Sequence, residues 1–491
     1  MRRRTIVAAG ASAVALTAAA RQRATARSLL SDRQRVALER RARVWKLTAR
    51  NGARLAVAKT RGVTASEARR AELDEQFAIR TAKDVAAELG QMKGALMKAG
   101  QLVSFIVEAL PDEAQQALAT LQADAPPMAP SLAAQVVREE FGQDPDRLFL
   151  DWDPTPIAAA SVGQVHRAVL HDGRVVAVKV QYPGVGDAIG ADLDNVEALY
   201  AVFGAFALKG LDTKALVDEL RARMVEELDY RLEARNQAEF ASFYDGHPFI
   251  RIPSLVPEYC STRVLCSEWV DGWSWAEFAA RADEPARRRA GEAIWRFAQG
   301  SVHRMGAFNG DPHPGNYRFH PDGTVTFLDF GLVKRWSAGE WDRLSPSLDA
   351  ILAGDPARLM AAMEAVDFLR PGSGLAPQQV FDYVSTPYRP YLVERFAFDR
   401  RFVRDAMSTI LDLNGPHAAV IERLNMPVSF VILDRVVWGV SALLGKLGVE
   451  GPWRSMLLEY RDAANEPATE MGRADAAWWA ARQPSGKRSA R

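Results

Sequence analysis

Apolar residues that follow position 84 recur at intervals of three, four and seven, which is the period of a helix packed along one face. The stripe comprises Leu89, Met92, Leu96, Val103, Ile106 and Leu110. Lys98 and Gln101 fall off this stripe, so the pattern predicts that their side chains point away from the packed face.

The pattern changes at Pro156, where strands replace helices. Residues 162–170 and 175–181 read as strands, and Asp172-Gly173 between them is a typical hairpin turn. Beyond this hairpin the pattern predicts helix at 187–240, a short strand at 264–270, helix to about 304, two short strands within 305–333, and helix to about 464.

One apolar stretch in the C-terminal half, Phe430–Leu447, is long enough to consider as a membrane span. Asp434 and Arg435 interrupt it. The stretch therefore predicts a buried helix of a globular domain.

The N-terminus combines features of several targeting segments. Three arginines precede Thr5–Ala20, which is only weakly apolar and shorter than the roughly 20 residues that a membrane helix needs. Small residues at Ala18–Ala20 match a secretory signal, whereas the arginines and the lack of acids before Asp32 match an organelle transit peptide. A short anchor or a targeting segment is therefore predicted here.

Charge is distributed unevenly along the 491 residues. The formal net charge of +1 argues against a general nucleic-acid binder. The first 50 residues nevertheless carry twelve Arg and one Lys against Asp32 and Glu39, a formal charge of +11. Such a basic arm binds anionic membranes or nucleic acid, or serves in targeting. Cys260 and Cys266 are too few for a disulfide framework and predict reduced core cysteines.

Two segments near residue 320 carry the strongest chemical signal. Asp311 and Asn316 have the D-x-x-x-x-N spacing of a kinase catalytic loop, and Asp329 begins an Asp-Phe-Gly after an apolar strand. In this interpretation Asn316 and Asp329 hold Mg²⁺ and Asp311 faces the nucleophile. Either segment alone could be a turn, but both occur in kinase order. His313, without nearby Cys or His, predicts a structural role.

Upstream segments supply candidates for the phosphate-binding parts. Lys179, in Val-Ala-Val-Lys, is either an edge-strand lysine in solvent or the lysine that grips the phosphates. The small residues of Ala158–Val165 allow close approach of backbone to phosphate, although alanine runs are often helical. Glu233 lies four residues after Asp229 and is either a partner for Lys179 or part of a solvated acidic face.

Together these motifs resemble the UbiB family of atypical kinases over about residues 85–335. Lys98–Gln101 matches its K-x-G-Q signature, Ala158–His166 its alanine-rich loop, and Glu227-Leu228-Asp229 its E-x-D motif. Asp311–Asn316 matches its catalytic loop, and Val180–Gly184 is also typical of the family. Many relatives have His where this chain has Asn309, a position that supports the loop without touching phosphate.

The resemblance implies an α+β, protein-kinase-like two-lobed fold with an added N-terminal helical region and a helix-rich C-lobe. The expected divisions are a basic arm and helical region at 1–83, a helical extension with the K-x-G-Q motif at 84–155, an N-lobe at 156–271, a C-lobe at 272–466 and a disordered tail at 467–491.

The resemblance also implies binding of ATP or ADP with Mg²⁺ and a role in ubiquinone or related isoprenoid-lipid metabolism at a membrane. The implied site comprises Asp311, Lys179 and Glu233 as catalytic residues, Ala159, Ala160, Ser161, Val162, Gln164, Lys179, Glu268 and Val270 for the nucleotide, Asn316 and Asp329 for the metal, and Lys98, Gln101, Glu227 and Asp229 as regulatory residues. Lys98 is expected to meet Glu227 or Asp229 and close the acceptor side.

Two other functions stay open. A nucleotide-binding pseudokinase would act as a regulator, although every candidate catalytic residue is present. A phosphotransferase of the aminoglycoside-kinase type shares the catalytic loop but has no reason to carry the K-x-G-Q signature. An ATP-dependent enzyme belongs in an ATP-containing compartment, so the expected place is the cytoplasm at the membrane periphery, with export the least favoured destination.

Overall fold

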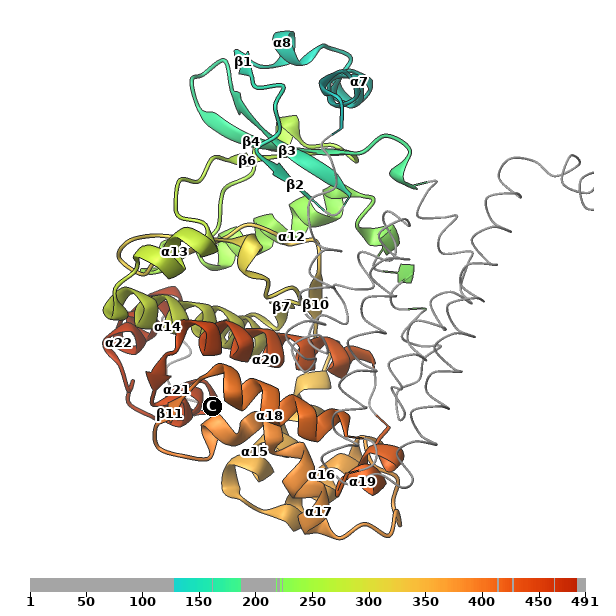
Figure 1. The fold of residues 1–491 in the computed structure, drawn as a ribbon, viewed down its shortest axis with the longest axis vertical. Coiled ribbons are helices and arrows are strands. Elements are labelled where there is room, and N and C mark those ends of the chain that lie inside the picture. Colours follow the sequence, from blue (N-terminus) through green and yellow to red (C-terminus); the bar gives the residue numbers. More distant parts are fainter. Residues whose placement is uncertain are drawn as a thin grey trace, which may run out of the picture.

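The structure is a computed structural model that describes residues 128–160, 162–186, 218, 221–222, 224–412, 415–425, 428–462 and 464–483. The basic arm, the helix predicted after position 84 with Lys98 and Gln101, and Ser161 lie outside these residues. The described residues form a small, strand-rich lobe and a larger, mainly helical lobe (Figure 1). This arrangement confirms the predicted α+β, two-lobed class.

The small lobe is built on one antiparallel sheet. Its strands are β1 (Asp151–Trp152), β2 (Ala158–Ala159), β3 (Gly163–Val169), β4 (Val175–Gln181) and β6 (Val264–Glu268). They run in the order β1-β3-β4-β6, with β2 also pairing with β3. The β3–β4 hairpin turns at Gly173, whose φ of 88° is a conformation that glycine adopts readily. The predicted strand-turn-strand is thus confirmed.

Helix α7 (Pro130–Phe141) covers one face of this sheet. Its Ala133, Val136 and Val137 are buried in one apolar core with side chains of β4 and β6. Gly142, with a φ of 71°, ends α7, and α8 (Pro145–Leu148) begins at a proline. The single helix predicted at 131–150 is therefore two. The small lobe also begins earlier than the predicted boundary at 156, because α7 and β1 pack or pair with its sheet.

Helix α12 (Tyr230–Phe243) lies below the sheet, between the two lobes (Figure 1). Asp229 caps its N-terminus by accepting a hydrogen bond from the Arg231 amide, which satisfies one of the donors that a helix end leaves open. Strand β5 (Ile250–Arg251) and the 3₁₀ turn η1 (Pro257–Tyr259) follow before β6.

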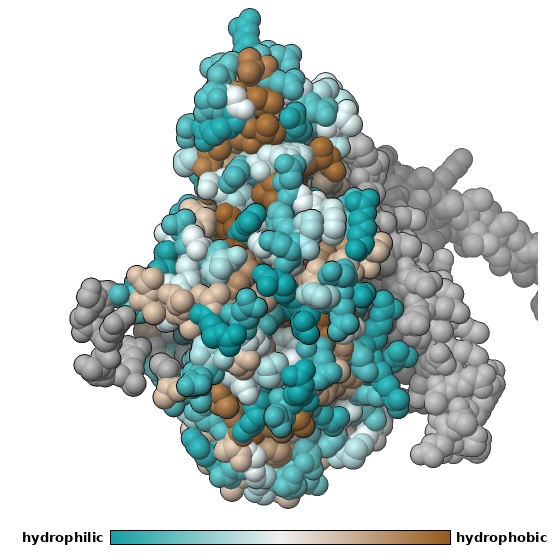
Figure 2. Space-filling view, turned by 90° about the vertical axis from the view of Figure 1, so that its left-hand side faces the viewer, coloured by the Kyte–Doolittle hydropathy of each residue, from teal (hydrophilic) through white to brown (hydrophobic). Residues whose placement is uncertain are grey.

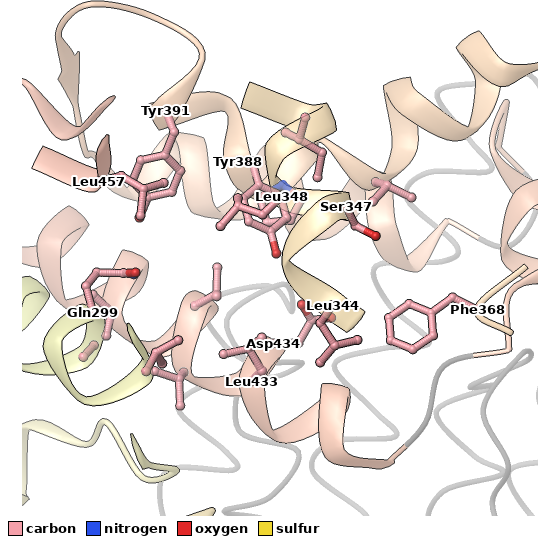
Figure 3. Close-up of a pocket in the computed structure, with 18 of the residues that line it drawn as sticks. Gln299, Leu344, Ser347, Leu348, Phe368, Tyr388, Tyr391, Leu433, Asp434 and Leu457 are labelled. Carbon is pink, nitrogen blue, oxygen red and sulfur yellow. The ribbon is translucent and has the colours of Figure 1, made fainter. Parts of the chain in front are cut away.

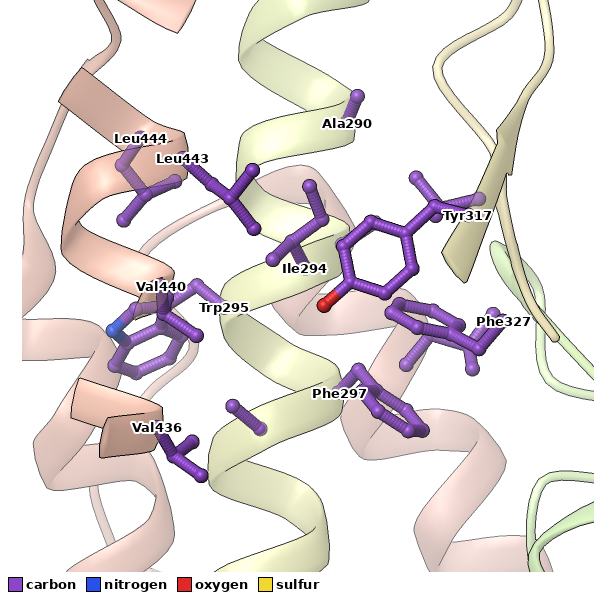
Figure 4. Packing of buried hydrophobic residues seen from close by; sticks show 14 of the residues in the cluster. Ala290, Ile294, Trp295, Phe297, Tyr317, Phe327, Val436, Val440, Leu443 and Leu444 are labelled. Carbon is purple, nitrogen blue, oxygen red and sulfur yellow. The ribbon is translucent and has the colours of Figure 1, made fainter. Parts of the chain in front are cut away.

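Helix α14 (Glu284–Gly300) forms the centre of the large lobe. In Figure 4 its Ile294 and Trp295 face helix α20 (Val428–Leu447), while Phe297 meets Phe327 of the neighbouring hairpin. Trp295 and Phe327 are fully buried. Burial of side chains of this size contributes roughly 1.5–3 kcal/mol each. The buried helix predicted at 430–447 is thus confirmed, and its apolar side chains complete the lobe's core.

The remaining elements surround α14 and α20. They are α13 (Trp275–Arg281), the π-helical turn η2 (Ser301–Met305), β7 (Ala307–Asn309), η3 (Pro314–Asn316), β8 (Tyr317–Phe319), β9 (Val325–Phe327), β10 (Val333–Arg335), α15 (Glu340–Ala353), α16 (Pro356–Ala365), α17 (Pro377–Val384), η4 (Thr386–Tyr391), β11 (Phe396–Ala397), α18 (Arg400–Leu411), α19 (Ala418–Arg423), β12 (Glu450–Gly451) and α21 (Trp453–Arg461).

The predicted disordered tail is wrong for residues 470–482, which form helix α22 (Glu470–Arg482). Asp475 of this helix is buried and accepts hydrogen bonds from Arg304 and, when its ring nitrogen carries the proton, from His247. A composition rich in Ala and charge concealed this contact, because the partners lie more than 170 residues earlier in the chain.

Surface character differs between the lobes on the face shown in Figure 2, where apolar side chains gather on the small lobe and hydrophilic ones cover much of the large lobe. Leu132, Leu150 and Ile157 are exposed apolar residues of the small lobe. Among the described residues, no helix combines the length and apolar character needed to span a bilayer.

Candidate active site

Lys179 and Glu233 form a buried ion pair between the sheet and α12. The Lys179 Nζ donates to both Glu233 carboxylate oxygens at 2.8 Å, and it lies 3.7 Å from Asp329 Oδ2. Lys179 is therefore not an edge-strand lysine with its amine in solvent. Strand β4 is a central strand, and the Lys179 side chain is only 13% exposed.

The electrostatic balance favours the charged form of Lys179. Burial by itself lowers the pKa of Lys179, but the Glu233 and Asp329 carboxylates outweigh it and hold that pKa well above its usual value. Burial also raises the pKa of Glu233, and the adjacent ammonium acts against that rise. The result is an ammonium group between the lobes that the Glu233 carboxylate holds in position and that lies near the Asp329 carboxylate.

Tyr230, the first residue of α12, completes the surroundings of the lysine. Its ring centre lies 5.0 Å from Lys179 Nζ, a cation–π distance. A side chain at Gly163 would bring a Cβ within 2.4 Å of the Val180 carbonyl oxygen and 2.6 Å of the Tyr230 hydroxyl, so only glycine fits there. Sequence reasoning missed Tyr230. Its position next to the E-x-D motif was the only available signal.

The β8–β9 hairpin brings the two halves of the catalytic signal together. Tyr317 pairs with Phe327, and the Leu328 amide donates to the Asn316 carbonyl oxygen at 2.9 Å. Asn316 and Asp329 therefore lie on neighbouring strand ends. The Asn316 Nδ2 donates to Asp311 Oδ2 at 3.0 Å, which joins the predicted metal ligand to the predicted catalytic carboxylate.

Asn309 occupies the position where many relatives have histidine. Its Nδ2 donates to the Asp329 carbonyl oxygen at 2.5 Å, and its Oδ1 accepts from the Asp311 amide at 2.8 Å. An amide can donate and accept at once, so Asn309 links the backbones of both loops. His313 accepts from the Gly315 amide, in keeping with the predicted structural role.

Arg435 of α20 is a site residue that sequence reasoning took only as an interruption of an apolar helix. Its Nη2 forms a charge-assisted hydrogen bond to Asp311 Oδ1, and its side chain is 5% exposed. Gly439, one turn later, lets α20 approach the loop, because a Cβ there would stand 2.3 Å from Pro312 Cγ. The loop at Asp311–Asn316 thus packs against α20.

The E-x-D segment adjoins the ion pair. Gln181 Nε2 donates to the Leu228 carbonyl oxygen at 3.1 Å and so ties the segment to β4. Around Gly331, a Cβ would lie 3.8 Å from Glu233 Oε2 and 3.9 Å from Glu227 Oε1, so these acids converge. Asp229 instead caps α12 and pairs with Arg231. The predicted contact with Lys98 falls outside the described residues.

The predicted nucleotide-binding residues differ in exposure and lie on opposite faces of the sheet. Ala159 is exposed and Ala160 half-buried at the start of the hairpin, and Val162 is buried. Val165 pairs with Lys179, so the alternation of side chains turns Gln164 to the opposite face.

The contacts of Gln164 do not favour its predicted role at the nucleotide. Its side chain is buried, lies 2.9 Å from the His166 ring nitrogen and accepts from the Met128 amide. Glu268 is exposed at the end of β6, and its carboxylate accepts a hydrogen bond from the Ser254 amide. Val270 follows, half-buried.

The metal expectation fits the donor chemistry. Asn316 and Asp329 present amide and carboxylate oxygens, and Mg²⁺ prefers such oxygens, with substrate phosphates completing its shell. The Asp329 Oδ1 accepts from the Gly331 amide, which orients the carboxylate. Within the described ranges, no group of three or more His, Cys, Asp or Glu side chains could hold a metal by itself.

Comparison with known proteins shows which family this chain resembles. Residues 120–363 match the ABC1 atypical kinase-like domain. The chain is 34% identical over 268 residues to the chloroplastic protein ACTIVITY OF BC1 COMPLEX KINASE 1 of Arabidopsis thaliana, a match covering 52% of this chain and 38% of that protein. It is 30% identical over 312 residues to the uncharacterized protein slr1919 of Synechocystis, covering 62% of this chain and 54% of the relative. The matches thus span no more than about half of these curated relatives.

A solved structure is similar over more of its length. The complex structure of Rv3197-erythromycin from Mycobacterium tuberculosis matches with a TM-score of 0.58 and 32% identity. The match covers 77% of this chain and 95% of that one.

Proposed function

The chain belongs to the ABC1/UbiB family of atypical kinases, and from this premise we propose that it binds Mg-ATP and transfers or hydrolyses its γ-phosphate. The observation that carries the proposal is the convergence of the Lys179–Glu233 pair on Asp329, with Asn316 and Asp311 joined on the adjoining loop. Kinases need these parts in this order.

Each residue has a role that its contacts support. Bound Mg-ATP would supply the phosphoryl group and the cation that offsets its charge. Lys179, aimed by Glu233, would pair with the phosphates, and Asn316 and Asp329 would hold the metal. Asp311 would orient the attacking hydroxyl or water and accept its proton, while Arg435 fixes the position of that carboxylate.

The finer function that we propose is support of ubiquinone or another isoprenoid-lipid pathway from the periphery of a membrane. The support is the family resemblance of the K-x-G-Q and E-x-D motifs and the charge of +11 in the first 50 residues. Lys98 would close the acceptor side of the site by reaching Glu227 or Asp229.

The test measures Mg-ATP binding and turnover by the full chain with Lys179→Met, Asp329→Asn and a control, Asp382→Asn. Asp382 is exposed on α17 and lies outside the site. At a ligand concentration 100 times Kd, binding adds about 2.7 kcal/mol of stability. The parent and the control should show this Mg-dependent stabilisation in thermal unfolding, and Asp329→Asn should lose it while staying folded, because an amide cannot replace the charge.

Turnover separates an enzyme from a nucleotide-binding regulator. We expect ATP hydrolysis by the parent that disappears in Lys179→Met, and a rise when anionic liposomes with extracted isoprenoid lipids are added. Nucleotide binding without turnover under any of these conditions would support the pseudokinase. Equal Mg-ATP stabilisation of the parent and Asp329→Asn would remove Asp329 from the site and contradict the proposal.

A further inference from the structure

A cavity lies inside the large lobe, among α14, α15, α17, η4 and α20. Its volume is about 160 Å³, and it is partly open. Aromatic and aliphatic side chains dominate its wall, among them Trp341, Phe368, Tyr391, Leu433 and Val440. A cavity of about 150 Å³ with such a lining can hold benzene, so this one suits an apolar group of similar size.

A carboxylate stands in this wall, beside the neutral polar side chains of Gln299, Ser347 and the tyrosines. Asp434 lies on α20 between Leu433 and Val436, both of which line the same cavity. Figure 3 shows Asp434 and the hydroxyl of Tyr388 pointing into the space that these residues enclose. Asp434 has no hydrogen bond or ion pair with any residue that the structure describes. The next residue, Arg435, is committed to Asp311 and supplies no counter-charge.

Asp434 is half-buried, and no cation offsets the effect of that burial on its carboxylate. Burial raises the pKa of Asp434, and no cation acts in the opposite direction. The titratable groups around it are Tyr383 of α17, Tyr388 and Tyr391 of η4, and His303 of η2, none of them a permanent cation. A carboxylate placed in an apolar wall is costly unless it is paired, so the cavity lacks one positive charge.

We propose that this cavity binds a small amphiphilic amine, with its ammonium group on Asp434 and its apolar body, about the size of a benzene ring, among the aromatic residues. The ammonium would donate to the carboxylate and lie near the Tyr388 ring, where a cation is attracted to the aromatic face. A neutral ligand of the same shape would fill the space but leave the carboxylate unpaired. This site is separate from the proposed ATP site and does not depend on that function.

The experiment is isothermal titration of the full chain at pH 8 with 2-phenylethylamine and with its neutral counterpart 2-phenylethanol. Three variants are compared with the parent: Asp434→Asn, the cavity-filling Val437→Phe, and the control Asp382→Asn on the exposed face of α17. Melting temperatures without ligand show that each variant is folded.

The parent and Asp382→Asn should bind the amine at least about tenfold more tightly than the alcohol, which corresponds to about 1.4 kcal/mol. Asp434→Asn should remove this preference, and Val437→Phe should abolish binding of both compounds. Equal affinity of the parent for amine and alcohol would show recognition of a neutral ligand. Unchanged amine binding by Asp434→Asn, or no saturable binding of the amine by the parent, would also overturn the proposal.

Discussion

The Arg435–Asp311 pair offers the sharpest test of how α20 supports the catalytic loop. The two side chains are 5% and 13% exposed, so neither charge is well solvated. Replacing Arg435 with Met would leave Asp311 buried with its hydrogen bond from Asn316 but without its cation. Removal of one partner from a buried pair costs about 3–5 kcal/mol. The remaining Asn316 contact places the expected loss near 3 kcal/mol.

The pairwise part of this energy is measured with a double-mutant cycle. Asp311→Asn strands the Arg435 guanidinium, whose Nη1 has no hydrogen-bond partner in the part of the chain that the structure describes. In the double variant neither charge is stranded, so its loss should be smaller than the sum of the single losses by about 2 kcal/mol. The assay is the free energy of unfolding in urea for all four proteins at pH 7.

The exposed pair Arg395–Glu450 is the matched control. Its atoms are 2.8 Å apart, but the side chains are 58% and 53% exposed. Exposed pairs contribute about 0.2–1 kcal/mol. If the Arg435–Asp311 coupling is no larger than that of this control pair, the buried contact does not stabilise the loop and the reasoning is refuted.

Three further predictions concern charge. Burial raises the pKa of Asp434 from 3.8 to about 7, so the cost of its charge is absent below pH 3.8 and grows as pH rises through 7. Because Asp434 is only half-buried and its cavity is partly open, urea unfolding from pH 4 to 8 should show Asp434→Asn gaining about 2 kcal/mol on the parent, less than the full shift would give. Although burial opposes it, pairing with His247, Arg304 and Arg296 lowers the pKa of Asp475, so Asp475→Asn should cost about 3 kcal/mol at pH 7 and progressively less below pH 4. Deleting residues 1–50 should weaken binding to anionic liposomes in flotation assays, and added salt should weaken binding of the intact chain, since each basic residue near the surface contributes about 1 kcal/mol.

The site was largely predictable where its signal is local. The motif around Asp311, Asn316 and Asp329 is recognisable because its turn and strand residues are close together in the sequence. The Asp172-Gly173 turn predicts its hairpin for the same reason. The order of the kinase motifs predicted a phosphate-binding role for Lys179, and this role stays a prediction. Its pairing with Glu233 could only be a hypothesis, because the two residues are 54 positions apart and meet only when α12 lies under the sheet.

What only the tertiary structure decided is which side chains face each other across long separations. Gln164 lies on the face of the sheet opposite to Lys179, because the register of β3 on β4 fixes alternate residues on opposite sides. Asp475 of α22 contacts His247 and Arg304, although composition alone predicted that this segment is disordered. Arg435 and Asp434 are consecutive interruptions of one apolar helix, yet one contacts Asp311, 124 residues earlier, and the other faces a cavity. Sequence determines that such a helix is buried, and the packing of α20 against its neighbours determines what each polar residue on it meets.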